Sequence, residues 1–302
     1  MLSVAIPKGS LEAQTLRLLK QADLEVKVTS REYSPRIDDP RVGKVKILRP
    51  QEIPEFVEQG YFDLGITGKD WVEERGAEVV EVADLSYSKI AEKEGSVKIV
   101  LAVQEDRADD RGGKEIKSAK DLPPQSKIST EYPNLTKSFF DQLGIPVQIF
   151  FSYGATEAKD MMDGIVELTE TGETLQKNNW RIIETILESS TKLIANKNSW
   201  HGDAEKRREI EEIRTLLSGV VEARGKVLLT MNVAEGRLRE VVSVLPAMKK
   251  PTVSKLYEQG QEQNYYAVET VVSKGEVNIL IPKLKSRGAE DIVEINITKI
   301  VR

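Results

Sequence analysis

The sequence contains no cysteine and only one histidine, His201, among its 302 residues. Disulfide bonds, thiolate metal sites and cysteine nucleophiles are therefore excluded. A single histidine cannot form a histidine metal cluster, and His201 lies in a polar segment at 199–203 that is typical of a surface turn. Candidate sites are therefore those built from carboxylates, hydroxyls, cationic side chains and backbone N–H groups.

The sequence also lacks an apolar run of membrane-spanning length, and its first residues are typical of a strand and a turn, not of a signal peptide. It has no excess of positive charge: the formal net charge of −5 argues against general binding to nucleic acids or anionic membranes. The hydrophobic fraction of 39% and the charged fraction of 31% are typical of a soluble globular protein, and the length of 302 residues is enough for two or three domains. We predict a soluble cytoplasmic protein.

The most informative segment that is present is residues 163–175, which read Asp-Gly-Ile-Val-Glu-Leu-Thr-Glu-Thr-Gly-Glu-Thr-Leu. Gly172 can adopt backbone angles that let several N–H groups converge, and a following helix start adds the positive end of its dipole. The hydroxyls of Thr171 and Thr174 complete a cradle suited to a phosphate monoester. Two upstream carboxylates suit sugar hydroxyls or a hydrated Mg²⁺. These groups predict a ribose 5-phosphate site, although an ordinary strand, turn and capped helix fits the same residues.

This segment resembles the phosphoribosyl-pyrophosphate loop of ATP phosphoribosyltransferase, the first enzyme of histidine biosynthesis. The family pattern is D-x-I-V-[DE]-L-x-x-T-G-x-T-L, and every fixed position is present here. Other segments match family motifs. They are the turn at 8–10, the D-L-G-I-x-G-x-[DE] signature at 63–70, a close counterpart of A-T-x-Y-P at 129–133, and a counterpart of G-S-x-E at 154–157 with Ala155 in place of serine. The resemblance extends from residue 1 to residue 302.

Strand and helix patterns alternate through the first two-thirds of the chain, which favours parallel sheets covered by helices. We expect a two-lobed α/β core of the periplasmic-binding-protein-like type. Residues 1–90 with 176–224 would form the first lobe, and residues 91–175 would form the second. In this interpretation the chain returns to the first lobe after residue 175, so strands at 180–187 and 191–196 would belong to that lobe.

Residues 225–302 show a different pattern, with strands and helices in the order βαββαβ over about 75 residues, which predicts a ferredoxin-like module. The module resembles the ACT-like C-terminal domain of the long form of this transferase, which carries feedback inhibition by L-histidine. In that family the inhibitor lies near the end of the first strand, before the second strand and at the last helix–strand turn. The matching residues here are Asn232, Met248, Thr252 and Asp291.

The resemblance implies an enzyme that condenses ATP with phosphoribosyl pyrophosphate. Such catalysis relies on orientation and charge stabilisation and needs no nucleophile or histidine base. The residues implied for phosphoribosyl pyrophosphate are Glu157, Asp163, Glu167, Thr171, Gly172, Glu173, Thr174 and Leu175. Those implied for ATP and diphosphate are Lys8, Gly9, Ser10, Arg49, Gly68 and Asp70. Mg²⁺ would bind mainly through the substrate, with Asp163 or Glu167 as candidate ligands, and the chain would form dimers and hexamers.

The alternative is a cytoplasmic two-lobed solute-binding or sensing protein, because its lobes share the strand–helix pattern and the re-entry of the chain into the first lobe. A third option is a catalytically silent regulatory paralogue, and the intact loop at 163–175 argues against it. Incubation with ATP, phosphoribosyl pyrophosphate and Mg²⁺ distinguishes these three hypotheses.

Overall fold

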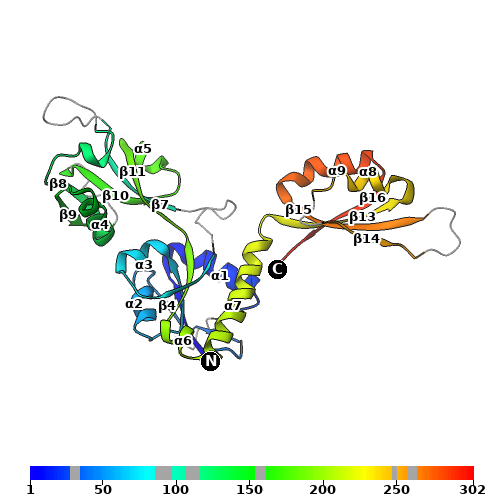
Figure 1. Ribbon diagram of the computed structural model, residues 1–302, viewed down its shortest axis with the longest axis horizontal. Coiled ribbons are helices and arrows are strands. Elements are labelled where there is room, and N and C mark those ends of the chain that lie inside the picture. The colour runs from blue at the N-terminus through cyan, green and yellow to red at the C-terminus, as the bar shows by residue number, and fades with distance from the viewer. Residues whose placement is uncertain (28–34, 86–96, 106–115, 154–160, 247–249, 258–263) are drawn as a thin grey trace. The chain divides into compact units, whose positions relative to one another are not determined.

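The computed structural model of the chain describes residues 1–27, 35–85, 97–105, 116–153, 161–246, 250–257 and 264–302. The chain divides into two compact units, Met1–Thr215 and Leu216–Arg302 (Figure 1). Among the described residues, no helix combines the length and the apolar character that a membrane crossing requires.

The first sheet of Met1–Thr215 has five strands in the order β4-β1-β5-β12-β6. Their bounds are β1 (Leu2–Pro7), β4 (Val42–Leu48), β5 (Leu64–Gly68), β6 (Val80–Asp84) and β12 (Thr191–Ala195). Strands β1, β4 and β5 are parallel, whereas β12 lies antiparallel between β5 and β6. A short pair, β2 (Val26–Lys27) and β3 (Arg36–Ile37), forms a separate ribbon.

The helices that accompany this sheet are η1 (Gly9–Leu11), α1 (Glu12–Gln21), α2 (Ile53–Glu58), α3 (Lys69–Arg75), α6 (Lys197–His201) and α7 (Ala204–Ala223). Helices α2 and α3 bury their apolar faces against the sheet. The buried cluster consists of Ala5, Ile53, Val57, Phe62, Val72 and Ile194. Burial of such side chains contributes about 1.5–3 kcal/mol for each large residue, so this cluster fixes α3 at the end of β5.

The second sheet has the order β11-β7-β10-β8-β9. Its strands are β7 (Val97–Gln104), β8 (Ser126–Thr130), β9 (Val147–Phe151), β10 (Gly164–Thr169) and β11 (Trp180–Ser189), and its helices are η2 (Ala119–Asp121), α4 (Pro133–Leu143) and α5 (Glu173–Lys177). Strand β8 is parallel to β9 and β10, and β7 is antiparallel to β10 and β11. The chain leaves the first sheet after β6 and re-enters it at β12, which is the two-lobed arrangement expected of the core. We call the two sheets with their helices the first lobe and the second lobe.

One predicted boundary between the lobes is wrong. We expected the strand at 180–187 in the first lobe, but β11 pairs along its length with β7 and belongs to the second sheet. The indole of Trp180 is buried, and this explains the placement. It packs in a cluster with Val100, Ala102, Ile165 and Leu175, all from the second lobe. The chain therefore crosses to the first sheet only at Ser190, one residue before β12.

The unit Leu216–Arg302 contains a four-stranded antiparallel sheet in the order β14-β15-β13-β16. Its elements are β13 (Lys226–Ala234), η4 (Glu235–Arg237), α8 (Leu238–Val242), β14 (Thr252–Lys255), β15 (Tyr265–Ser273), η5 (Lys274–Glu276), α9 (Val277–Ser286) and β16 (Ala289–Asn296). Alternate residues of β13 are buried, and α8 and α9 cover that face (Figure 1). This strand order confirms the predicted ferredoxin-like βαββαβ module.

Candidate functional site

Several of the predicted ligand residues of the core lie at the carboxyl ends of parallel strands. Lys8 follows β1, Arg49 follows β4 and Gly68 ends β5. In the second lobe, the turn at 170–172 follows β10. The carboxyl ends of parallel strands meet at one edge of a sheet, and ligands of open α/β sheets bind at that edge. The topology therefore gathers these segments at the edge of each sheet where a ligand is expected.

The turn between β10 and α5 contains the glycine on which the predicted phosphate cradle depends. Gly172 has φ of 79° and forms the N-cap of α5. Its N–H donates to Thr169 Oγ1 at 2.9 Å, and the N–H of Glu173 points to Thr171 Oγ1 at 3.4 Å. A Cβ atom on Gly172 would lie 3.1 Å from Ile182 Cδ1. Both the left-handed angle and the close neighbour favour glycine here.

The other loop residues divide into exposed and buried positions. The side chains of Thr171, Glu173 and Thr174 are exposed, as a ligand contact requires. Leu175 is only 2% exposed and packs in the second-lobe core, so it can meet a ligand only through its backbone N–H. The loop is thus anchored by one apolar side chain and presents hydroxyls at the start of a helix. Its role in phosphate binding stays a prediction.

The two upstream acids differ in their surroundings. The N–H of Asp163 donates to the Lys127 carbonyl at 2.8 Å, and Asp163 Oδ2 accepts the Lys127 N–H at 2.6 Å. Glu167 is partly buried on β10, opposite Val100 of β7. Carboxylate oxygens are ligands that Mg²⁺ prefers. Within the described ranges, however, no group of three or more acidic or histidine side chains could hold a metal ion. Binding of Mg²⁺ by Asp163 or Glu167 stays a prediction. Glu157 lies outside the described residues.

The turn after β1 contains a glycine in the left-handed conformation. Gly9 has φ of 83°, and its N–H donates to Glu12 Oε2 at 3.0 Å. Ser10 lies inside η1, and the N-cap of α1 is Leu11, which makes no side-chain capping bond. The carboxylate of Glu12 takes the capping bond instead. Lys8 is exposed at the start of this turn, where an anionic ligand can reach it.

The signature segment at the end of β5 places its acid in the interior. Asp70 is only 3% exposed and accepts hydrogen bonds from Tyr132 Oη at 3.0 Å and Ser189 Oγ at 2.6 Å. Burial raises the pKa of Asp70, and the two hydroxyls oppose that shift. A Cβ atom on Gly68 would lie 2.1 Å from Asp70 Oδ1, so glycine makes room for this carboxylate. Contact of Asp70 with a nucleotide stays a prediction.

A cavity of about 350 Å³ lies where elements of the two lobes meet. Its lining includes Arg49, Trp71, Glu74, Glu131, Asn134 and Tyr153. Among the described residues, Arg49 is the predicted ligand residue that lines it, and its guanidinium is exposed there. A planar fork of donors beside aromatic rings suits a nucleotide polyphosphate. The position of Arg49 is therefore compatible with its predicted role.

The sequence interpretation missed the contacts that join the lobes. Glu74 lies one turn after Asp70 on α3 and accepts bonds from the start of α4, and the ring of Trp71 stacks on Tyr132 with centroids 4.7 Å apart. The i,i+4 spacing of the two acids was visible in the sequence and indicates a common helix face. Their partners, 60 or more residues away, had no local signal.

The candidate histidine site lies on the sheet face that α8 and α9 leave open. Asn232 Nδ2 donates to Asp291 Oδ2 at 2.9 Å, so the structure brings these two predicted residues together. Asp291 has φ of 49° and lies in an irregularity of the β13–β16 register. Thr252 on the edge strand β14 shares that face. Met248 lies outside the described residues.

The comparisons with known proteins agree with this architecture. The family model "ATP phosphoribosyltransferase" matches residues 49–219, and the model "HisG, C-terminal domain" matches residues 223–299. An ATP phosphoribosyltransferase of Chlorobium phaeobacteroides is 46% identical over 100% of this chain and 98% of its own length, and that of Chlorobium phaeovibrioides is 45% identical with the same coverage. A chain of the solved ATP phosphoribosyl transferase (HisG:HisZ) complex from Thermotoga maritima shares 25% identity and a TM-score of 0.57, covering 72% of this chain and 99% of that chain. With both its core and its C-terminal module matched, the chain belongs to the ATP phosphoribosyltransferase family.

Proposed function

We propose that this chain transfers the 5-phosphoribosyl group of phosphoribosyl pyrophosphate to N1 of the adenine of ATP, the first step of L-histidine biosynthesis. The bond from the anomeric carbon to the diphosphate oxygen breaks, the bond from that carbon to N1 forms from the N1 lone pair, and diphosphate leaves. The family match across both units carries this proposal. The same match favours the transferase over a solute-binding protein.

The described residues can orient both substrates without supplying a nucleophile. The turn at Gly172 presents the exposed side chains of Thr171 and Thr174 to the 5-phosphate at the start of α5. Arg49 and Lys8 offer positive charge to the triphosphate and the leaving diphosphate. Charge that develops on a leaving group is stabilised most by donors that are already in place. Mg²⁺, carried by the phosphate oxygens with Asp163 or Glu167 as candidate ligands, would neutralise the diphosphate as it leaves.

The test is a direct assay. The purified full-length chain is incubated with ATP, phosphoribosyl pyrophosphate and MgCl₂, and N1-(5-phosphoribosyl)-ATP and diphosphate are quantified by liquid chromatography with mass detection. We expect both products in equal amounts, and a large fall in rate when EDTA removes the metal. The absence of product from folded protein would overturn the proposed function, and an unchanged rate in EDTA would overturn the role of Mg²⁺.

L-histidine is the proposed inhibitor, bound by the C-terminal module at Asn232, Thr252 and Asp291. The polar pair Asn232–Asp291 on an open sheet face supports this assignment. Coupling between sites is typically worth about 1–3 kcal/mol and is reciprocal, so substrates should also alter histidine affinity. The variant Asp291→Ala should keep its activity and lose inhibition. A chain ending near Arg224 should also lose it, and unchanged inhibition of that chain would refute the assignment.

Assembly and location complete the proposal. We expect a homo-oligomer, as dimer or hexamer, in the cytoplasm. Light scattering of the purified chain, with and without L-histidine, measures the assembly. A monomer under both conditions would contradict the expected oligomer.

A further inference from the structure

Helix α4 begins without a cap from its own sequence. Its N-cap residue is Tyr132, which makes no side-chain capping bond. The first turn of a helix carries N–H groups with no partner inside the helix, and a missing cap typically destabilises it. The partner comes instead from α3, about 60 residues earlier. Glu74 Oε1 accepts the Asn134 N–H at 3.1 Å, and Glu74 Oε2 accepts the Leu135 N–H at 2.9 Å.

The contact is reciprocal. Asn134 Nδ2 donates to the backbone carbonyl of Glu74 at 2.9 Å, so each helix both gives and receives hydrogen bonds. Glu74 is only 5% exposed. Two N–H groups in adjacent positions define a direction as well as a distance, because hydrogen bonds weaken when they bend. The cap therefore fixes the orientation of α4 relative to α3.

A second carboxylate on the same face of α3 binds two further segments of the second lobe. Asp70, four residues before Glu74, accepts the hydroxyl of Tyr132, the residue that precedes α4. It also accepts the hydroxyl of Ser189, the last residue of β11 before the chain crosses to the first sheet. The face of α3 that carries Asp70 and Glu74 thus binds the second lobe at two points.

Buried carboxylates are a costly way to hold two helices together. Well-packed apolar side chains of similar volume are often at least as stabilising, whereas hydrogen-bonded charges add directional specificity. The same region forms a wall of the cavity, since Glu74, Asn134 and Trp71 line it together with Arg49. A change in the direction of α4 would therefore move one wall of the cavity away from Arg49.

We propose that Glu74 is a positioning residue: by capping α4 across the lobes, it sets the separation between the ATP-side residue Arg49 and the second lobe. The groups that it positions are those that take part in the proposed phosphoribosyl transfer. The positioning role therefore rests on the proposed function. Glu74 acts through α4 and contacts no reacting atom. Its effect should therefore fall on steps that need both lobes, and not on binding to the loop of the second lobe alone.

The experiment compares Glu74→Ala and Glu74→Gln with Glu73→Ala in the full-length chain. Glu73 is exposed on the same helix and so controls for the loss of one acid from α3. Hydrogen–deuterium exchange of the amides at 134–135 reports the cap. Steady-state kinetics with ATP report the transfer, and calorimetry reports the affinity for phosphoribosyl pyrophosphate alone.

For Glu74→Ala we expect rapid exchange at 134–135 and a fall in kcat/KM of about ten- to a hundredfold, the size produced by a small misplacement of reacting groups. The affinity for phosphoribosyl pyrophosphate should change less than about twofold, a margin below the free energy of one ordinary hydrogen bond. Glu74→Gln, which keeps one acceptor oxygen, should recover part of the rate, and Glu73→Ala should match the wild type. If Glu74→Ala does not fold, Glu74→Gln takes its place with a smaller effect.

Two results would overturn the proposal. Unchanged exchange at 134–135 in Glu74→Ala would show that the cap does not hold α4 in solution. A deprotected cap with kcat/KM within twofold of wild type, or with an equal loss of affinity for phosphoribosyl pyrophosphate, would show that Glu74 is only structural. If the wild type transfers no phosphoribosyl group, the proposed function fails and takes the positioning role with it, while the exchange data still decide whether the cap exists.

Discussion

Asp63 in the first lobe and Asp163 in the second occupy equivalent places. Each lies immediately before a central strand, β5 or β10, beside a parallel neighbour. The N–H of Asp63 donates to the Ser3 carbonyl at 2.9 Å, and its Oδ2 accepts the Ser3 N–H at 2.8 Å. Asp163 makes the same pair of bonds with Lys127, at 2.8 and 2.6 Å. Both lobes therefore begin a pair of parallel strands with the same two hydrogen bonds from an aspartate, which we call the aspartate clasp.

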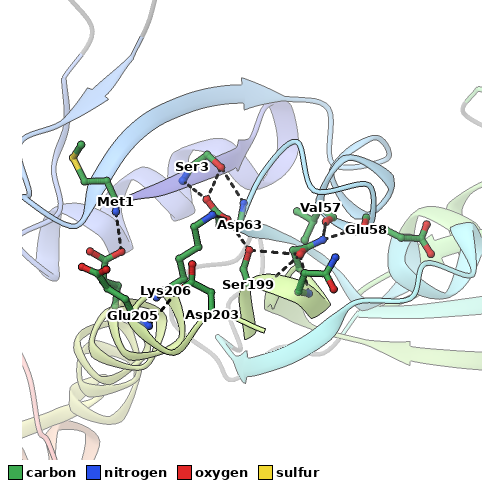
Figure 2. Close-up of polar contacts among 12 residues, drawn as sticks. Met1, Ser3, Val57, Glu58, Asp63, Ser199, Asp203, Glu205 and Lys206 are labelled. Atoms are coloured by element: carbon green, nitrogen blue, oxygen red, sulfur yellow. Dashed lines mark hydrogen bonds and ion pairs between the residues drawn. The ribbon is translucent and has the colours of Figure 1, made fainter. Parts of the chain in front are cut away.

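The second carboxylate oxygen of Asp63 is also engaged. Asp63 Oδ1 accepts Ser199 Oγ at 2.6 Å and Lys206 Nζ at 2.7 Å, so it ties the sheet to α6 and α7 (Figure 2). Asp63 is buried, whereas Asp163 is only partly buried at the start of the strand that leads to the phosphate-loop turn. The same residue in the same backbone setting is thus tied to two helices in one lobe, whereas in the other it lies at the opposite end of β10 from the phosphate-loop turn. An aspartate in a family motif does not by itself identify a ligand contact.

The largest effect should come from Asp63→Ala. Removal of one partner of a buried ion pair costs about 3–5 kcal/mol, and we expect roughly 3 kcal/mol because Lys206 is about one-third exposed. Asp163→Ala removes the charge-assisted bond to the Lys127 N–H, and we expect a loss of about 1.5 kcal/mol because Asp163 is only partly buried. Urea unfolding followed by circular dichroism measures both. Equal losses for the two variants would break the distinction between the clasps.

Arg49→Ala should affect function far more than folding. Loss of a charge-assisted phosphate contact costs roughly 1.5–3 kcal/mol of productive binding, while truncation of an exposed arginine changes stability by about 0.5 kcal/mol or less. The control is Arg17→Ala on α1, also an exposed arginine of the first lobe. Steady-state kinetics and thermal unfolding should separate the two variants. Wild-type kinetics for Arg49→Ala would place this side chain outside the site.

Gly172→Ala should lower both stability and substrate affinity. A non-glycine residue in the left-handed region costs roughly 1–2 kcal/mol, and the new Cβ would meet Ile182. Gly144, with φ of 70° after α4 and no neighbour within 4 Å of an added Cβ, provides the matched control. Calorimetry should show weaker binding of phosphoribosyl pyrophosphate for Gly172→Ala alone. A branched valine at 172 should lower stability further. Equal affinities for the two alanine variants would remove the phosphate assignment of the loop.

The smallest effect should be a change in acid sensitivity. Burial alone would raise the pKa of Asp63, but hydrogen bonds from Lys206, Ser199 and the Ser3 N–H lower it below its ordinary value. The stabilisation is therefore complete above the unfolded pKa of about 3.9 and is lost as pH falls through the folded value. The difference in unfolding free energy between wild type and Asp63→Asn should shrink over that range. A pH-independent difference would contradict this. The difference is the useful quantity because Asp70 and Glu74, whose pKa values burial raises, act in the opposite direction.

The strands of both lobes and the C-terminal module were predictable because they are short apolar runs bounded by turns. The runs that became β1, β7 and β13 carry a buried face that any sheet would cover. The turn at Gly172 was predictable for a related reason, since the glycine and hydroxyl residues that form it are adjacent in the sequence.

Contacts between distant segments were not predictable. The sequence around Trp180 does not indicate that β11 pairs with β7. A strand with this alternation of buried and exposed residues could join the edge of either sheet. The cap formed by Glu74 was missed because its partners lie in another lobe. The burial of Asp70 was missed as well, because an acid at a helix start is usually solvated. A sequence pattern predicts a helix or a strand, whereas the partners of that helix or strand depend on how the whole fold packs.

The position of β12 has a consequence for the synthesis of the chain. This strand lies between β5 and β6 in the first sheet, yet it is translated about a hundred residues after β6. At about 5–20 residues per second, β6 leaves the ribosome roughly 5–20 s before the strand that pairs it to the sheet. The second sheet is contiguous in the chain, from β7 to β11, and can be completed during that interval. The second lobe is therefore fully translated before the first lobe, and it presents β12, which begins only two residues after β11, to the waiting edge of β5.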